Sequence, residues 1–185
     1  MAKIDPLKAL TKRSDAVVIR TAVLSDASQV LAIAREAMAE GIYTVVQVHE
    51  AWTVEQLQTH IQEHLDGPAH LFLVADVEGT VVGSIDFSPG HRQRVAHTGE
   101  FGMTIAKEWR EQGIGSLLLR ALLGWAEKAP EIDKVNLTVH STNERAMGLY
   151  KKLGFKVEGR RTHDLKYGPD SYVDTVLMGR LVKEI

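Results

Sequence analysis

Short apolar runs rich in β-branched residues alternate with amphipathic stretches of helical period along nearly the whole chain. The run at residues 71–77 is almost continuously apolar, which predicts a strand buried on both faces. Such alternation favours a mixed α/β fold, with helices packed on the faces of one sheet. Strands are predicted at residues 17–20, 71–77, 81–87, 97–106, 134–140, 155–163 and 172–182, and helices at 27–38, 54–66, 113–128 and 144–153.

The bulk composition is that of an ordinary globular chain. Its 185 residues are 44% hydrophobic and 25% charged, which suits one domain over residues 16–185, with residues 1–15 as a loose tail or short helix. The net charge of -2 gives no reason to expect nucleic acid or an acidic membrane surface as a partner. With 0 cysteines and no apolar run near the roughly 20 residues of a membrane helix, we expect a cytoplasmic protein.

A glycine pair separates the strand predicted at 97–106 from the longest predicted helix. Gly113 and Gly115 let backbone N–H groups approach a ligand closely, and the first amides of a helix have no internal partner. A diphosphate suits this positive helix end, and Arg110 can add a bidentate contact. The spacing of the two glycines is equally compatible with an ordinary tight turn between a strand and a helix. It also lacks the third glycine of the dinucleotide fingerprint and the Lys-Ser/Thr ending of a P-loop.

Two motifs occur in order around the long helix and the strand that follows it. The first is Arg110-x-x-Gly113-x-Gly115, and the second spans residues 143–155 with Asn143, Ala146, Tyr150, Gly154 and Phe155. In these motifs, and in the order of elements across residues 17–182, the chain resembles the GCN5-related N-acetyltransferase (GNAT) family. The resemblance implies N-acetyltransfer from acetyl-CoA. It also implies a mixed, mostly antiparallel sheet in which one parallel strand pair splays apart.

The resemblance further implies where acetyl-CoA lies. Strands 97–106 and 134–140 are the splayed pair, and the pantetheine arm runs between them along the backbone of residues 103–105. The amides of residues 112–116 hold the pyrophosphate, while Asn143 contacts the arm or the nucleotide end. The cofactor-binding residues implied in this way are Met103, Thr104, Ile105, Arg110, Glu111, Gln112, Gly113, Ile114, Gly115, Ser116, Asn143 and Tyr150.

Direct attack of an amine on a thioester needs a base for the amine and an acid for the leaving thiolate. The resemblance makes Tyr150 the acid, although its place on an apolar helix stripe also fits a simple core residue. Glu100 is the candidate base, since some relatives carry an acid at or next to this strand position. A solvated or salt-bridged carboxylate explains Glu100 equally well. Asp86, His97 and His140 remain alternatives for proton transfer.

The histidines do not predict a metal site. Of 8 histidines, only His60 and His64 share a helix face at i, i+4 spacing, and no HExxH pattern surrounds them. We therefore expect an exposed helix face there and no bound metal.

The acceptor amine is expected to be set by the irregular segments at 40–53, 88–96 and 164–171. Residues 158–178 resemble the branch of the family that contains ribosomal-protein, amino-acid and phosphinothricin-type acetyltransferases. This branch spans several acceptor classes. Among them we expect a small primary amine, such as an amino acid or its analogue, with a protein or peptide α-amine as the alternative. A module that binds acyl-CoA without turnover also stays open.

The last predicted strand, at residues 172–182, carries an apolar row that suggests self-association. Relatives often pair or pack this strand across a two-fold axis, so we expect a homodimer. The row consists of Val173, Val176, Leu177 and Met178.

Overall fold

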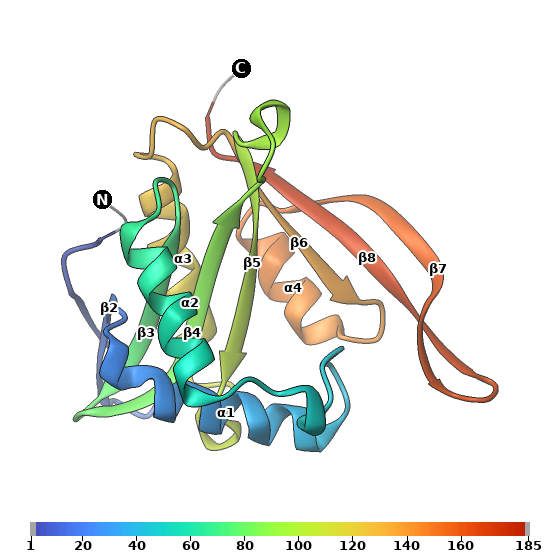
Figure 1. The fold of residues 1–185 in the computed structure, drawn as a ribbon, viewed down its shortest axis with the longest axis horizontal. Coiled ribbons are helices and arrows are strands. Elements are labelled where there is room, and N and C mark those ends of the chain that lie inside the picture. Colours follow the sequence, from blue (N-terminus) through green and yellow to red (C-terminus); the bar gives the residue numbers. More distant parts are fainter. Residues whose placement is uncertain (1–2, 184–185) are drawn as a thin grey trace.

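The computed structural model describes residues 3–183 and contains one eight-stranded sheet in the order β1-β2-β3-β4-β5-β6-β8-β7 (Figure 1). Every neighbouring pair is antiparallel except β5 and β6, which run parallel. The prediction of a mixed, mostly antiparallel sheet is therefore confirmed. The strands are β1 (Leu7–Leu10), β2 (Ala16–Thr21), β3 (Leu71–Val77), β4 (Thr80–Pro89), β5 (Thr98–Ile105), β6 (Lys134–His140), β7 (Lys156–Gly168) and β8 (Ser171–Leu181).

Helices cover both faces of this sheet. On one face, α1 and α2 pack on β3 and β4 through a buried cluster that includes Leu31, Ile61 and Phe72. On the other face, α3 and α4 pack over a larger cluster that includes Leu118 and Val135. The helices are α1 (Ala27–Glu40), α2 (Val54–Asp66), α3 (Ile114–Ala126) and α4 (Glu144–Lys152), with short 3-10 turns at Leu24–Asp26, Val48–Glu50, Gln93–Val95 and Lys107–Trp109.

Local sequence signals set several of these boundaries. A capping box begins α2: Gln56 N donates to Thr53 Oγ1 at 3.3 Å, and Thr53 N donates to Gln56 Oε1 at 2.8 Å. Gly154 follows α4 with φ +86°, a left-handed conformation that suits the end of a helix. Strands β3 and β6 occupy the predicted ranges.

The N-terminal segment forms a strand where a loose tail or short helix was predicted. Residues Leu7–Leu10 are β1, which pairs antiparallel with β2. Further along, Lys12 N donates to the Gln112 carbonyl at 3.1 Å. The prediction failed because only Ala9 in β1 is even partly buried. Backbone pairing rather than an apolar pattern therefore holds this strand. Residues 1–2, also part of the predicted tail, lie outside the described residues, as do 184–185.

Strand β8 lies inside the sheet, hydrogen-bonded to β6 on one side and to β7 on the other. The idea that this last strand offers a pairing edge for self-association is therefore wrong. Its Val176 and Met178 are 6% and 1% exposed and belong to the core. The terminal strand at this end of the sheet is β7, and the β7–β8 hairpin projects from the body as an arm (Figure 1).

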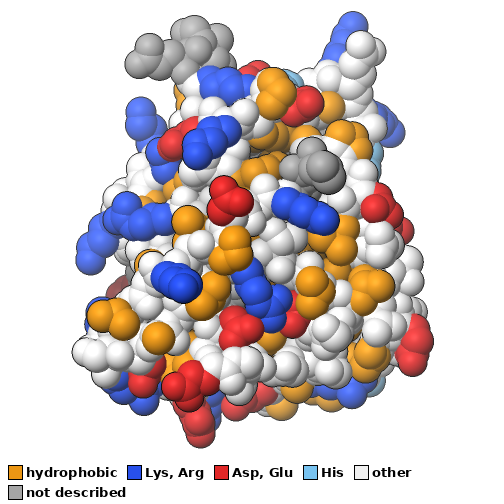
Figure 2. Space-filling model, turned by 90° about the vertical axis from the view of Figure 1, so that its left-hand side faces the viewer, with side chains coloured by type: hydrophobic (Ala, Val, Ile, Leu, Met, Phe, Trp, Pro, Cys, Tyr) orange, Lys and Arg blue, Asp and Glu red, His pale blue; other side chains and the backbone are white. Residues whose placement is uncertain are grey.

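Across residues 3–183, none of the helices combines the length and the apolar character needed to span a membrane. On the face shown in Figure 2, basic and acidic side chains are interspersed. That face therefore lacks the single-sign charge that attracts nucleic acid.

Candidate active site

Strands β5 and β6 pair over only three residues and then separate. Thr98, Gly99 and Glu100 pair with residues 134–136, whereas β5 continues to Ile105. Backbone groups beyond the last pair face a gap in which an extended ligand can add as a strand does. Figure 1 shows the two strands diverging, with α4 visible between them. The predicted splayed pair is present, and residues 103–105 lie on its open arm.

The N-terminal end of α3 presents amides without protein partners. The first amide of this helix to reach a carbonyl is Leu117 N, which donates to Gly113 O at 3.1 Å. Within residues 3–183, no hydrogen bond engages the amide N–H groups of residues 112–116. Free amides at the positive end of a helix make a site that suits a phosphate group.

The backbone of this loop explains one of its two glycines. Gly113 has φ +88°, a conformation that residues with a Cβ rarely adopt. Glu111 has φ +67°, and its exposed carboxylate lies 3.0 Å from Arg145 of α4. At Gly115, an added Cβ would lie 3.5 Å from the Met103 side chain, which is an ordinary contact. Only Gly113 is therefore required by the fold of the loop.

Arg110 is engaged within the protein. Its Nη1 lies 2.6 Å from Glu40 Oε2 at the end of α1, and its Nε donates to the Ile105 carbonyl at 3.2 Å. The hydrogen bond from Arg110 holds the pKa of Glu40 below its usual value. Arg110 thus ties the loop to α1 and β5, and its predicted contact with phosphate competes with this ion pair.

The remaining predicted cofactor residues flank the free amides. Ile114 is 1% exposed and anchors α3 in the core, while Ser116 Oγ accepts from Arg120 Nε at 3.3 Å. Asn143 caps α4, because its Oδ1 accepts from Ala146 N at 3.1 Å.

Tyr150 lies on the α3–α4 side of the fork. Its ring packs against Phe101, at a centroid distance of 5.8 Å, and against Phe155, at 6.0 Å. Phe101 is the first β5 residue beyond the last pair with β6, so the phenol sits close to where the strands part. The side chain is 8% exposed, and this burial raises the pKa of Tyr150 to about 12. The hydroxyl therefore carries its proton at neutral pH.

Glu100 lies on the opposite face of the sheet, at the last pair before the fork. It is exposed and alternates with Phe101, which packs into the α3–α4 core, so it faces the α1–α2 side. Asn136 is its partner on β6 and shares that face. Asn136 Oδ1 is buried and has no hydrogen-bond partner among the described residues. Sequence reasoning missed Asn136, whose only signal was a polar residue inside an apolar strand.

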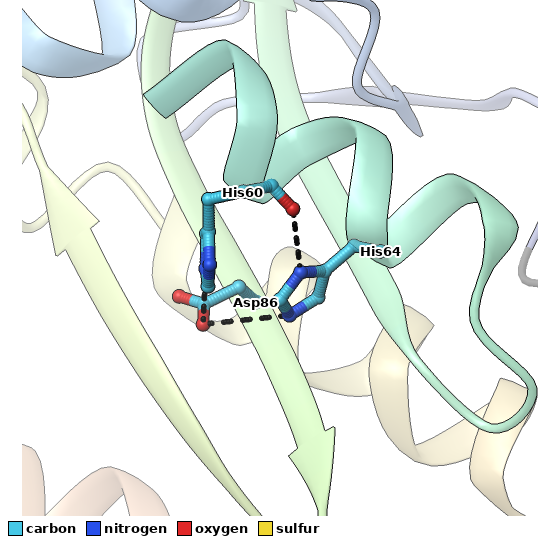
Figure 3. Close-up of side chains that lie close together, drawn as sticks. All are labelled: His60, His64 and Asp86. Atoms are coloured by element: carbon cyan, nitrogen blue, oxygen red, sulfur yellow. Dashed lines mark hydrogen bonds and ion pairs between the residues drawn. The ribbon is translucent and has the colours of Figure 1, made fainter. Parts of the chain in front are cut away.

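Three titratable side chains converge beside this face (Figure 3). His60 Nε2 and His64 Nε2 lie 3.7 and 4.0 Å from Asp86 Oδ2. His64 is 2% exposed, and burial lowers its pKa. The expectation of an exposed histidine face on α2 is therefore wrong for His64. The pattern revealed the shared helix face, but the partner on β4 is a contact that only the fold creates.

Two of the three segments expected to set the acceptor line one groove. Residues 44–49 and 164–167 border a volume of about 440 Å³ beside the end of α1. The Tyr167 hydroxyl donates to Ile42 O at 3.2 Å and lies 2.7 Å from His140 Nε2. Burial lowers the pKa of His140, which is 6% exposed. The segment 88–96 does not border this groove, and His97 beside it is exposed.

A forked parallel strand pair beside a free helix end is the arrangement expected of an acyl-CoA-dependent N-acyltransferase. The sequence matches the acetyltransferase (GNAT) family over residues 27–155, more than half of the chain. The protein belongs to this GNAT family and is an acetyltransferase, so the resemblance of its motifs is confirmed.

Similarity to known proteins, in sequence and in structure, supports this assignment. The chain is 34% identical to the L-amino acid N-acetyltransferase AaaT of Escherichia coli (strain K12), over 65% of this chain and 74% of that protein. It is 29% identical to an N-alpha-acetyltransferase of Sulfurisphaera tokodaii, over 84% and 89% of the two chains. The structure of a Salmonella typhimurium acetyltransferase with its cofactor acetyl-CoA shares the fold, with TM-score 0.83 and 19% identity over 91% of this chain and 95% of that one.

Proposed function

We propose that the protein transfers the acetyl group of acetyl-CoA to the primary amine of a small molecule, such as an amino acid or its analogue. The observation that carries the proposal is the run of free amides at residues 112–116 beside the fork of β5 and β6. The 34% identical relative named as an L-amino acid N-acetyltransferase supports the choice of acceptor.

In this proposal, the amides of residues 112–116 bind the pyrophosphate, and the pantetheine arm lies in the fork. Backbone groups of residues 103–105 on β5, which have no β6 partner, pair with the arm. The thioester then lies near Glu100, where the strands meet. Glu100 and Tyr150 reach this point from opposite faces of the sheet.

The reaction is a direct attack. The neutral amine nitrogen bonds to the thioester carbonyl carbon, and backbone N–H groups on the open arm of β5 stabilise the oxyanion. The C–S bond then breaks, the amine proton passes to Glu100 and the thiolate takes a proton from Tyr150. Asn136 Oδ1, buried without a donor among the described residues, can accept a hydrogen bond from an N–H of the bound substrate.

Tyr150 suits the acid role because of its surroundings. Burial raises its pKa to about 12, which keeps the phenol protonated but makes it a weaker acid. The same apolar environment disfavours the charged thiolate formed beside it and so raises its basicity. Proton transfer therefore accompanies departure of the thiolate rather than following it.

Substitution of the acid and the base separates catalysis from binding. We expect Tyr150→Phe and Glu100→Gln each to lower kcat by about 100-fold or more, with acetyl-CoA affinity nearly unchanged. Tyr172→Phe, an exposed tyrosine on the β7–β8 arm, is the matched control. If both active-site variants kept full turnover, the proposed proton path would be wrong.

The acceptor is tested by measuring free thiol release with acetyl-CoA and a panel of amines. Amino acids and their analogues are expected to react best. The N-alpha-acetyltransferase that is 29% identical favours the alternative, a protein or peptide α-amine. If peptides reacted best, the alternative acceptor would be correct. If no amine were acetylated, the protein would be a module that only binds acyl-CoA.

We also infer that the enzyme works as a cytoplasmic homodimer. The sequence has 0 cysteines, as suits a reducing compartment. Because β8 is paired on both sides, association by strand pairing would have to use another edge, such as the outer edge of β7. Light scattering that finds only monomers would reject the dimer.

A further inference from the structure

The cluster of His60, His64 and Asp86 belongs neither to the fork nor to the free amides. The two histidines lie one turn apart on α2, and the aspartate reaches them from β4 (Figure 3). Their ligand atoms, one from each side chain, all lie within 4.8 Å of one another. Two imidazoles and one carboxylate thus face a common point.

The two separations between the histidine Nε2 atoms and Asp86 are too long for hydrogen bonds. His60 Nε2 and His64 Nε2 lie 3.7 and 4.0 Å from Asp86 Oδ2, whereas a charged N–H···O bond is about 2.8 Å long. Ligands bound to one tetrahedral Zn²⁺ at about 2.0–2.1 Å lie roughly 3.3 Å from each other. The two distances from Asp86 are thus closer to those between ligands of a shared ion, and metal binding would have to shorten them by about 0.4 and 0.7 Å.

His64 is oriented as a metal ligand requires. Its Nδ1 lies 2.8 Å from the His60 carbonyl, which can only accept, so Nδ1 carries the proton. The Nε2 of the neutral ring therefore carries the lone pair and accepts a hydrogen bond from Ser88 Oγ at 3.0 Å, while Asp86 Oδ2 lies 4.0 Å away. A bound ion would take the place of the Ser88 hydroxyl proton. In metal-binding histidines, the ring nitrogen that does not bind the metal usually donates a hydrogen bond to a carboxylate, a backbone carbonyl or water, which fixes the ring.

The cluster is closed on one side and open on the other. His60 packs against Trp52, at a centroid distance of 4.8 Å, and against Phe72, at 6.0 Å. The His64 side chain is 2% exposed, whereas those of His60 and Asp86 are 23% and 33% exposed. An ion held here would therefore have fixed, partly desolvated ligands and a coordination position that solvent can reach.

We propose that His60, His64 and Asp86 form a binding site for one Zn²⁺ or a similar divalent transition metal ion. Two imidazole nitrogens and one carboxylate suit zinc better than Mg²⁺ or Ca²⁺, which prefer sites made of oxygen ligands. Three protein ligands leave a fourth position for water. Asp86 lies opposite Gly102 of β5, so the ion lies on the same face of the sheet as Glu100.

The test uses the whole protein, stripped with a chelator, dialysed and titrated with ZnCl₂ alone by calorimetry. One ion per chain is expected to bind. The site should also bind Co²⁺ with the visible absorption of a low-symmetry, four-coordinate ion. Loss of an outer partner of a metal ligand costs about 10- to 100-fold in affinity, so loss of a ligand in His60→Ala or Asp86→Asn should cost at least 100-fold.

His91→Ala provides the matched control, because His91 is exposed on a loop and lies outside the cluster. Thermal melts without metal establish that each variant folds, and added Zn²⁺ should raise the melting temperature of the wild type and of His91→Ala only. Absence of stoichiometric binding would overturn the proposal, as would binding that survives both cluster substitutions. If metal-free protein is fully active and the cluster variants lose turnover without any binding of zinc, the three residues form a proton relay instead.

Discussion

At the scale of single residues, the groups that define the site are polar atoms without a protein partner. Asn136 Oδ1 and Gln112 Oε1 are buried and have no hydrogen-bond partner among the described residues. The amides of residues 112–116 have no hydrogen-bond partner there either. A buried polar group left unpaired costs about 1–3 kcal/mol. Because a bound ligand would remove this cost, we propose that these atoms mark the two ends of one binding path, the helix end and the fork.

Gly113 provides the sharpest test at this scale. Its φ of +88° means that Gly113→Ala strains the loop by about 1–2 kcal/mol and shifts the free amides. We expect the KM for acetyl-CoA to rise at least tenfold. Gly124→Ala is the control, since an added Cβ on this α3 glycine meets nothing within 4 Å and should stabilise the helix by about 0.5–1 kcal/mol. An unchanged KM in Gly113→Ala would mean that the amides do not bind the pyrophosphate.

At the scale of elements, the sequence predicts what local patterns encode. Strands β3 and β6 and helix α2 lie where predicted. Strand β1 was missed because it buries almost nothing, and the place of β8 inside the sheet depends on non-local pairing. The same limit applies to the site. Motifs indicate the loop at 110–116, but Asn136 and the partner of the α2 histidines come together only in the fold.

The ion pair of Glu40 and Arg110 joins the end of α1 to the loop at residues 110–116. We expect this pair to make the free energy of unfolding depend on pH. Arg110 lowers the pKa of folded Glu40 below the ordinary 4.5, so the pair stabilises the fold above pH 4.5 and this contribution is lost as the pH falls through the folded pKa. We expect Glu40→Gln to lose about 1 kcal/mol at neutral pH. In urea titrations, its difference from the wild type should shrink below pH 4.5.

The control for this prediction is Glu63→Gln, which alters an exposed carboxylate on α2. It should leave the free energy of unfolding nearly unchanged across the same pH range. If the difference between Glu40→Gln and the wild type stayed constant down to pH 3, the ion pair would not be the source of the stabilisation.

At the scale of the whole molecule, two parts of the chain that are distant in sequence meet beside the end of α1. The loop after α1 and the β7–β8 arm border the same groove, and the Tyr167 hydroxyl bridges them. It donates to Ile42 O, so its 2.7 Å contact with His140 Nε2 requires the imidazole to donate. Strand β6, which supplies His140, thereby holds the loop and the arm in one arrangement.

Loss of this bridge should affect the acceptor and leave acetyl-CoA binding intact. Tyr167→Phe removes two hydrogen bonds, each contributing about 1 kcal/mol, and frees the loop from the arm. We expect the KM for the amine to rise about tenfold and amide exchange in residues 42–49 to accelerate. The KM for acetyl-CoA should stay within about twofold, because the helix end and the fork are untouched. The control, Tyr172→Phe, should change neither KM. If Tyr167→Phe raised both KM values equally, the bridge would support the entire fold rather than the groove bordered by residues 44–49 and 164–167.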